Sequence, residues 1–281
     1  MMYKNMRTDM RKDIRYSLYH KYLLLSNIND NIIKDAEYDN LEREYILKIG
    51  YDLLALDSKS NNGYNIMFSK LIDENKRIGA NLNYTTYKNK NESNSNKGNL
   101  YLGNFFYHSK LEDVSDLFIS LYGGRFKSNG KKSLSEKGTM IGTNFKYTHF
   151  LKYLDFFDIN ASYFVKADFS RTTYKINKMK KDNDSIQGDF GLDLKKNLIL
   201  TETDRKIDVG VKLSYSNEFM PKRKYKSFNS KDPYEGSING KIYIDLKVNE
   251  IVDVNANYEI KKCIRTSKTN NVVSVGFKIK I

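Results

Sequence analysis

The sequence predicts an all-β fold, a twelve-stranded antiparallel transmembrane β-barrel with an N-terminal helical segment that could lie in the lumen. Three observations lead to this prediction. Apolar and polar residues alternate over segments of about ten residues, the length that a tilted strand needs to cross hydrocarbon. The connections between these segments alternate between long and short. The sequence contains no run of about 18 apolar residues, so helical membrane spans are excluded, and its mean hydropathy of -0.65 suits strands that alternate.

The alternation is clearest in the C-terminal third of the chain. The segments Ile207 to Tyr215, Ile238 to Leu246 and Val252 to Ile260 each place apolar residues at nearly every second position, with mostly polar residues between them. The segment at 97–108 is the least clear, because apolar residues occur on both of its faces. The twelve predicted strands cover residues 45–56, 63–71, 77–87, 97–108, 114–127, 137–151, 153–166, 185–195, 205–217, 236–248, 251–263 and 270–281.

The first 41 residues follow a different pattern. Apolar residues recur there at spacings of three, four or seven, which predicts one or two short helices between Thr8 and Leu41. The chain contains only two prolines and no linker rich in Gly, Ser or Pro. We therefore expect two parts, a helical lead-in or linker at 1–41 and a β-barrel at 42–281.

The predicted connections differ by position. Those that follow odd-numbered strands are often long and always polar, whereas those that follow even-numbered strands are mostly short, which is typical of an up-and-down barrel in an outer membrane. An even number of strands returns the C-terminus to the end where the first strand began, the expected periplasmic end. The long connections are Lys88–Asn96, Lys127–Glu136, Ser170–Asp184 and Glu218–Glu235, the short ones include Leu151–Tyr153 and Val248–Ile251, and Lys195–Asp204 is an exception.

Alternation alone does not say which face of the strands meets water. A soluble sandwich or ligand-binding barrel would bury the apolar face. Three features favour a membrane instead: charges are concentrated on the polar face, the segments exceed the usual strand length, and aromatic residues gather near the segment ends. The polar face should then line a lumen, where mixed charges fit either a hydrated interior that holds a helix or a solvated polar wall. The residues predicted to face the lumen are Lys212, Lys241, Asp245, Asp253, Glu259 and Lys261.

The formal charge of +14 has two interpretations, an anionic partner or a genome biased toward Lys, Asn and Ile codons. A nucleic-acid site would need aromatic residues interleaved on one basic face, and the stretch Lys224 to Lys226 is too short for one. We therefore predict no nucleic-acid partner. The basic runs Lys175–Lys181 and Pro221–Lys226 suit either contact with lipopolysaccharide phosphates or solvated loops.

No pattern in the sequence predicts a catalytic site. His20 lies in the lead-in, and His108 and His149 lie at the ends of even-numbered strands, which places them toward the expected periplasmic end. No zinc-ligand spacing is present, and Gly123-Gly124 lacks the rest of a phosphate-binding loop. The single Cys263 can form no internal disulfide. We therefore expect no enzyme activity, no metal and no cofactor.

Several of these features together resemble the translocator, or β-domain, of an autotransporter, the type V secretion family. The resemblance covers nearly the whole chain, as a helical lead-in before twelve strands. The segment Arg77–Tyr84 resembles the family's third strand, and Leu246–Tyr258 and Val272–Ile281 resemble its closing hairpin and final strand. The family usually ends in Phe or Trp, whereas this chain ends in Ile. The alternating apolar residues of the final strand are kept, at Val273, Val275, Phe277, Ile279 and Ile281.

The resemblance implies an outer-membrane translocator that supports export of an N-terminal passenger to the cell surface. It also implies that the helical segment plugs the lumen and that the closing strand is the assembly signal. The implied location is the bacterial outer membrane. The implied partners are outer-membrane lipid and lipopolysaccharide, the barrel-assembly machinery and the chain's own upstream passenger.

No passenger domain and no secretory signal precede the first predicted strand. We therefore expect the chain to be the C-terminal part of a longer protein or the product of a split gene. The alternative function is a stand-alone outer-membrane β-barrel that acts as a pore or adhesin.

Overall fold

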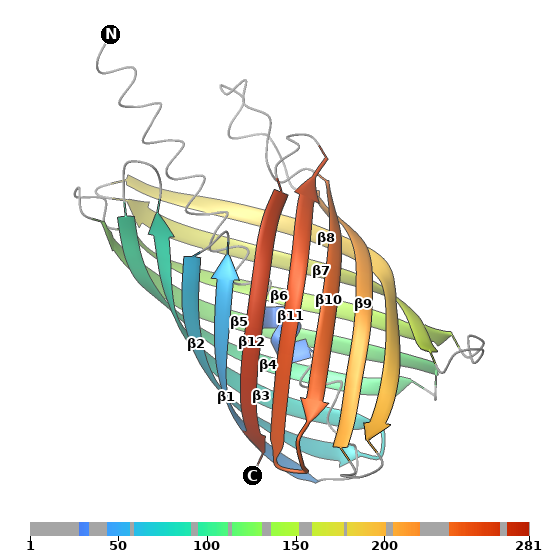
Figure 1. Ribbon diagram of the computed structural model, residues 1–281. Helices are drawn as coiled ribbons and strands as arrows, with labels where there is room; N and C mark the ends of the chain where they lie inside the picture. The colour runs from blue at the N-terminus through green and yellow to red at the C-terminus, as the bar shows by residue number, and fades with distance from the viewer. Residues whose placement is uncertain are drawn as a thin grey trace.

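The computed structural model describes residues 28–33, 44–56, 59–90, 95–111, 114–130, 136–151, 159–176, 179–200, 205–219, 236–264 and 269–280. Twelve strands form one closed antiparallel barrel, which confirms the predicted fold (Figure 1). The strands are β1 (Tyr45–Leu56), β2 (Lys59–Asp73), β3 (Lys76–Lys90), β4 (Ser95–Leu111), β5 (Ser115–Gly130), β6 (Glu136–Leu151), β7 (Ile159–Ile176), β8 (Met179–Leu200), β9 (Arg205–Glu218), β10 (Ser237–Lys247), β11 (Val252–Cys263) and β12 (Thr269–Lys280).

Each strand pairs with its neighbours in sequence, and the first and last strands close the barrel. β1 and β12 pair from Lys48 opposite Lys280 to Leu56 opposite Val272. Closure gives every strand two hydrogen-bonded neighbours, so no sheet edge remains open along the barrel. The C-terminus lies at the same end as the turn that joins β2 to β3 and the turn that joins β10 to β11 (Figure 1).

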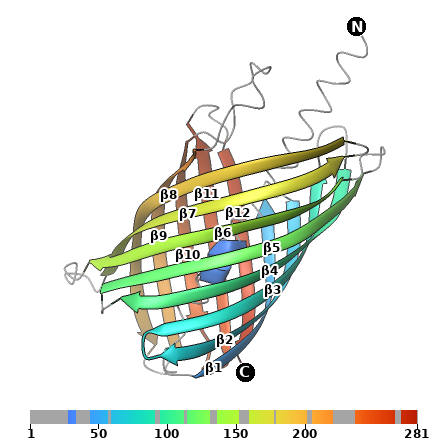
Figure 2. The ribbon, with the colours of Figure 1, turned by 180° about the vertical axis from the view of Figure 1, so that it is seen from behind.

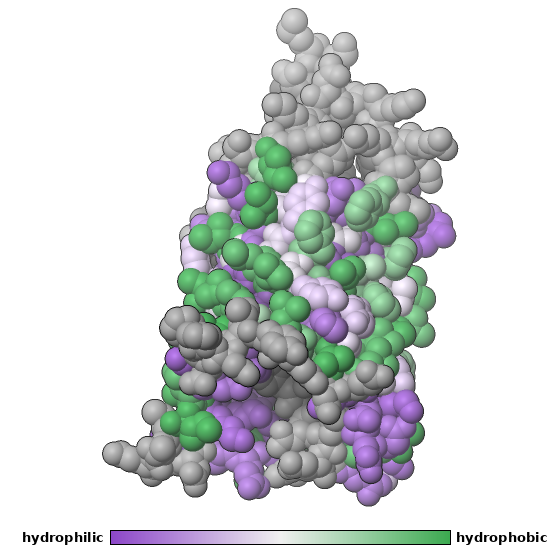
Figure 3. All heavy atoms as spheres, turned by 90° about the vertical axis from the view of Figure 1, so that its right-hand side faces the viewer, coloured by the Kyte–Doolittle hydropathy of each residue, from purple (hydrophilic) through white to green (hydrophobic). Residues whose placement is uncertain are grey.

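The two faces of the barrel wall carry different side chains. Leu82 and Phe105 point outward and are exposed, whereas the adjacent residues Asn81 and Asn104 point inward and are buried. Figure 3 shows one side of the molecule, where apolar side chains (green) cover the middle and hydrophilic ones (purple) gather toward the lower end. An apolar outer band around a polar interior is the arrangement of transmembrane barrels.

Some predicted strand boundaries are wrong, chiefly around β7. The predicted loop Ser170–Asp184 lies mostly within strands, because β7 continues to Ile176 and β8 begins at Met179. The predicted short turn after Leu151 is longer, because the next strand begins at Ile159. Polar side chains on the outer face pair across β7 and β8 and stabilise the extension. Thr173 donates a 2.7 Å hydrogen bond to Asp182, and Arg171 lies 3.5 Å from Asp184.

The other polar connections also contain strand residues. β3 continues to Lys90 and β4 begins at Ser95, while β5 ends at Gly130 and β6 begins at Glu136. The exception on the short-turn side is shorter than predicted, because β8 continues to Leu200. Polar composition misled the prediction here, since strands that extend past the apolar band carry polar residues on both faces.

Aromatic rings on the inner face pack against glycines of the neighbouring strand. Tyr122 on β5 covers Gly142 on β6, and Tyr243 on β10 covers Gly210 on β9. A Cβ atom at either glycine would overlap the ring. The missing side chain therefore lets a large ring lie flat against the wall, which keeps the centre of the lumen free for other groups.

A short helix at residues 28–33 occupies that centre, and Figure 2 shows it (blue) enclosed by the strands. A helix of this length has too few internal hydrogen bonds to persist alone in water. Its stability must therefore come from contacts with the barrel wall. The rest of the predicted lead-in at 1–41 lies outside the described residues.

Candidate functional site in the lumen

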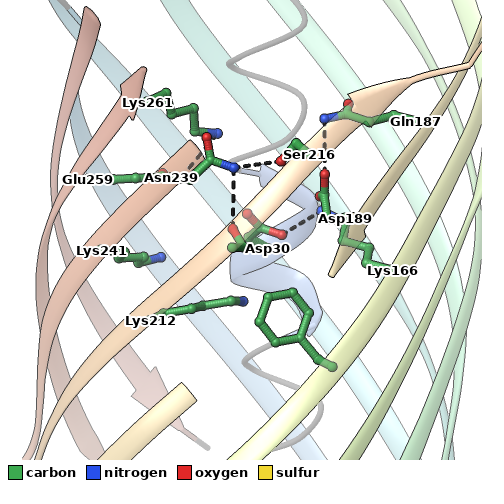
Figure 4. Close-up of a pocket in the computed structure, with 12 residues that line it drawn as sticks. Asp30, Lys166, Gln187, Asp189, Lys212, Ser216, Asn239, Lys241, Glu259 and Lys261 are labelled. Carbon is green, nitrogen blue, oxygen red and sulfur yellow. Dashed lines mark hydrogen bonds and ion pairs between the residues drawn. The ribbon is translucent and has the colours of Figure 1, made fainter. Parts of the chain in front are cut away.

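The polar side of the helix faces a basic wall built by β7, β9, β10 and β11 (Figure 4). The Asp30 carboxylate accepts a 2.6 Å charge-assisted hydrogen bond from the Lys166 ammonium group. Lys212 on β9, Lys241 on β10 and Lys261 on β11 line the same cavity. The cavity volume is about 40 Å³, which leaves room for a few water molecules only.

The electrostatics of this wall keep Asp30 ionised. Burial alone would raise the pKa of the Asp30 carboxyl, but Lys166 opposes it most strongly, followed by Lys212, Lys241 and Lys261. Together these ammonium groups hold the pKa of Asp30 below its usual value of 3.8. The helix thus carries a negative charge to a wall where four lysines outnumber the carboxylates Asp189 and Glu259, and the direct contact with Lys166 favours one position of the helix.

A second polar contact joins the helix to β5, β6 and β7. The Asn29 side chain donates a 3.4 Å hydrogen bond to the Asp168 carboxylate. That carboxylate also accepts hydrogen bonds from the Tyr122 hydroxyl at 2.9 Å and from the Asn144 amide at 3.2 Å. Asp168 therefore connects the helix to three strands of the wall.

The helix also contacts an apolar part of the wall, with Ile28 and Ile32 on the side opposite Asp30. Ile28, Ile32 and Ile33 are buried and belong to one cluster with inward-facing side chains of the barrel. Most of these wall residues come from β4, β5 and β6, whereas the lysines around Asp30 come from β7 to β11. The wall members of the cluster are Leu54, Met67, Tyr87, Leu100, Leu102, Phe106, Phe118, Tyr122, Phe126, Met140, Tyr174 and Val272.

The residues predicted to face the lumen occupy two levels of the barrel. Lys212, Lys241, Glu259 and Lys261 line the cavity beside the helix. Within this set, Glu259 and Lys261 form an ion pair of 3.3 Å. The Lys212 ammonium group lies 4.0 Å from the centre of the Phe164 ring, a favourable cation–π contact.

Asp245 and Asp253 do not reach the helix. They lie near the turn that joins β10 to β11, at the end of the barrel that holds the C-terminus. Asp245 is buried, and Asp253 forms a 2.8 Å ion pair with Lys280.

Sequence reasoning missed the groups that hold the helix. Lys166 is the last residue of the predicted seventh strand, and Asp168 lies two residues beyond its predicted end. Continuing the alternation through Phe164, Lys166 and Asp168 would have found both. Asp30 gave no comparable signal, because the periodicity of a helix does not say where the helix docks.

The closing strand β12 has one apolar and one small or polar face. Val273, Val275, Phe277 and Ile279 point outward, with 37–44% of their surface exposed. The intervening Ser274, Gly276 and Lys278 are buried on the inner face. The terminal Ile281 lies outside the described residues.

Neither described histidine lies beside the helix. His108 is buried on the inner face, with Nε2 3.5 Å from Asp116. His149 lies on the outer face, where Nδ1 is 3.1 Å from the Ser115 hydroxyl. Within the described ranges, no group of three or more His, Cys, Asp or Glu residues could hold a metal ion. The part of the chain that is described also contains no helix long and apolar enough to cross a membrane.

Comparisons with known proteins identify the fold. No protein-family model and no curated protein matches the chain. Among solved structures, the translocator domain of the autotransporter NalP from Neisseria meningitidis is similar, with a TM-score of 0.66 and 10% identity over 94% of this chain and 98% of that one. The chain shares the fold of that autotransporter translocator domain.

Two further solved structures share the barrel fold. The β-domain of the Bordetella autotransporter BrkA matches with a TM-score of 0.58 and 13% identity over 84% of this chain and 98% of its own. LpxR from Salmonella typhimurium matches with a TM-score of 0.51 and 5% identity over 83% of this chain and 99% of its own. The comparisons therefore show the fold of the barrel, and the role of its lumen has to be argued from its residues.

Proposed function

We propose that the chain is the outer-membrane translocator domain of an autotransporter and supports export of a passenger attached to its N-terminus. The observation that carries this proposal is the helix at 28–33, which comes from the N-terminal side of β1 and lies inside the closed lumen. A segment that precedes β1 in the sequence and lies inside the barrel is expected if an N-terminal passenger has passed through the lumen. The fold of the similar autotransporter domains supports the same role.

The wall chemistry supports the plugged state. Asp30 among the four lysines and the isoleucines in the apolar cluster hold the helix from opposite sides. The proposal assigns no catalytic step to the barrel. A stand-alone pore is disfavoured, because the helix at 28–33 lies inside the lumen and is held there by the barrel wall.

The outer apolar face supports a place in the outer membrane, with the C-terminal end toward the periplasm. Outward-facing side chains such as Leu82, Leu121 and Ile141 are 64–67% exposed, a cost in water that lipid would remove. Assembly there would require the barrel-assembly machinery, to which β12 would present its alternating face.

The test is a surface-display experiment in a Gram-negative host. The full chain is expressed behind a secretory signal and an epitope tag, and intact cells are treated with protease. We expect the tag to be removed while the barrel remains folded in the outer-membrane fraction. A tag that stays protected although the barrel is folded there would overturn the export proposal. A barrel recovered in the aqueous fraction without detergent would overturn the membrane location as well.

A further inference from the structure

The outer face of four neighbouring strands carries a row of four lysines. Lys127 on β5 lies directly opposite Lys137 on β6, which lies opposite Lys175 on β7, which lies opposite Lys180 on β8. All four side chains are exposed. Because neighbouring strands lie about 4.8 Å apart, the row extends over roughly 14 Å. We define these four residues as the lysine row.

No ion pair within the described residues holds a lysine of the row, and the nearest exposed carboxylate on this face, Asp182 on β8, accepts its hydrogen bond from Thr173. Like charges directly opposite one another destabilise a sheet, so this arrangement calls for an anion from outside. The contrast with the same face of β7 and β8 is direct. There Arg171 lies opposite Asp184, and the two form a 3.5 Å ion pair.

An apolar groove lies next to the lysine row on the outer face, on the side toward the turn that joins β4 to β5. Its floor is Gly103 on β4 opposite Gly123 on β5, where the absence of side chains leaves open space. Leu82 and Tyr101 form its walls, and both are more than half exposed. The groove volume is about 960 Å³, enough for acyl chains.

The groove and the lysine row form one continuous surface. Lys127 and Lys137 line the upper end of the groove, and Arg125 lies between Lys127 and the glycine floor. Lys127 is four residues beyond Gly123, about 13 Å along the strand. The basic end is the one opposite the C-terminus, since β5 runs away from the turn end toward Gly130.

We propose that the lysine row and the groove bind a lipid whose headgroup carries two or more phosphates, with the phosphates on the lysines and an acyl chain over the glycine floor. A row of roughly 14 Å exceeds what one phosphate can neutralise, which selects a multiply phosphorylated headgroup. A phosphorylated glycolipid of the outer leaflet has this chemistry. That source rests on the proposed outer-membrane location, whereas the binding itself depends only on the folded barrel.

The test uses the purified full chain in detergent micelles and native mass spectrometry. The probes are bis-phosphorylated lipid A, the same glycolipid without phosphates, and phosphatidylglycerol. We expect bis-phosphorylated lipid A to bind most tightly. The triple variant K127Q/K137Q/K175Q should weaken its binding on the order of 100-fold, since each lysine near an anionic lipid contributes about fivefold. The control triple K70Q/K196Q/K262Q removes exposed lysines of β2, β8 and β11 that lie outside the lysine row, and it should leave binding unchanged.

A second variant tests the groove without changing charge. Gly123→Leu fills the floor, where a new Cβ meets only ordinary contacts, so the barrel should fold and lipid A binding should fall at least fivefold. The control Gly240→Leu adds the same side chain at another open glycine, on β10, and should have no effect.

Three outcomes would overturn the site. These are equal binding of phosphatidylglycerol, equal loss in the two control variants, or no loss in K127Q/K137Q/K175Q. Failure of surface display with lipid A binding intact would overturn the proposed function and leave this site standing.

Discussion

The lumen has two halves that hold the same helix by different physical means. On the side of β4 to β6, the wall presents apolar side chains such as Leu102 and Phe118, and the isoleucines of the helix pack against them. On the side of β7 to β11, the wall presents lysines, and Asp30 is held among them by charge. The apolar half supplies contact area, whose stabilisation salt does not screen, whereas the basic half supplies a directional charge contact that salt can weaken.

The two halves should differ in how selectively they hold a segment inside the barrel. Packing against the apolar half stabilises any apolar segment of suitable size, since the hydrophobic effect is non-directional. The contact of Asp30 with Lys166, by contrast, requires a carboxylate at one position along the barrel axis. We therefore expect variants of the apolar half to loosen the helix generally and variants of the basic half to lose its register.

Removing the closing strand should have the largest effect, because both halves depend on closure of the barrel. Deletion of 272–281 removes the partner of β1 and of β11 along most of their length. Two strand edges would then be exposed in lipid, where unpaired backbone groups are costly. We expect no folded barrel in the outer-membrane fraction, as judged by heat-modifiable mobility on a gel. Normal insertion of this deletion would contradict the assignment of β12 as the closing strand.

The apolar half is tested by Ile32→Ala combined with Ile33→Ala. Each truncation of a buried isoleucine costs about 2–5 kcal/mol, so the pair should weaken helix docking on the order of 4–10 kcal/mol. The barrel should stay folded, because its strands remain paired. We expect a higher single-channel conductance in planar bilayers than for the unmodified chain. Asn31→Ala on the same helix is the matched control, and unchanged conductance in the double variant would show that packing does not hold the plug.

The basic half is tested by Asp30→Asn, which removes the carboxylate in direct contact with Lys166 and leaves that lysine the less strongly acting charges of Asp189 and Asp168. Breaking a buried ion pair costs 3–5 kcal/mol, and we expect about 3 kcal/mol because the Asp30 side chain is 29% exposed. Backbone hydrogen exchange of residues 28–33 should accelerate accordingly. If exchange is unchanged, the charge contact does not hold the helix.

The same contact predicts how the plug responds to acid. The folded-state pKa of Asp30 is lowered, so its contribution is complete above the usual value of 3.8 and is lost as the pH falls through the lower folded value. Conductance of the unmodified chain should therefore stay constant from pH 8 to pH 5. Opening of the channel between pH 5 and pH 6 would point to a different titrating group.

The sequence was informative about the two halves to different degrees. Lys212, Lys241 and Lys261 lie on strands with a clean period of two, so their inward direction could be predicted. The segment at 97–108 was ambiguous because its inner face is apolar too. Its inward residues Leu100, Leu102 and Phe106 belong to the same apolar cluster as the isoleucines of the helix. A strand with two apolar faces in an otherwise alternating barrel indicates a plug contact.

The remaining errors have two physical causes. Strand ends such as that of β7 extend beyond the apolar band on polar cross-strand pairs, which composition does not distinguish from a loop. The docking of Asp30 depends on distant strands that meet only after the barrel closes. Local periodicity therefore predicts the wall, and only the closed structure places the helix within it.

The smallest expected effect on helix docking concerns the hydrogen bonds of Asp168. This residue on β7 joins Asn29 of the helix to Tyr122 on β5 and Asn144 on β6. Tyr122→Phe keeps the ring over Gly142 but removes the hydroxyl that donates at 2.9 Å to the Asp168 carboxylate. Asp168 retains Asn144 and Asn29, so we expect a loss of about 1–2 kcal/mol in helix docking. Hydrogen exchange of residues 28–33 should accelerate about tenfold, and less than for Asp30→Asn. Tyr64→Phe, an exposed tyrosine of the outer face, is the control. An effect of Tyr122→Phe as large as that of Asp30→Asn would mean that Asp168, rather than the lysines, sets the register of the helix.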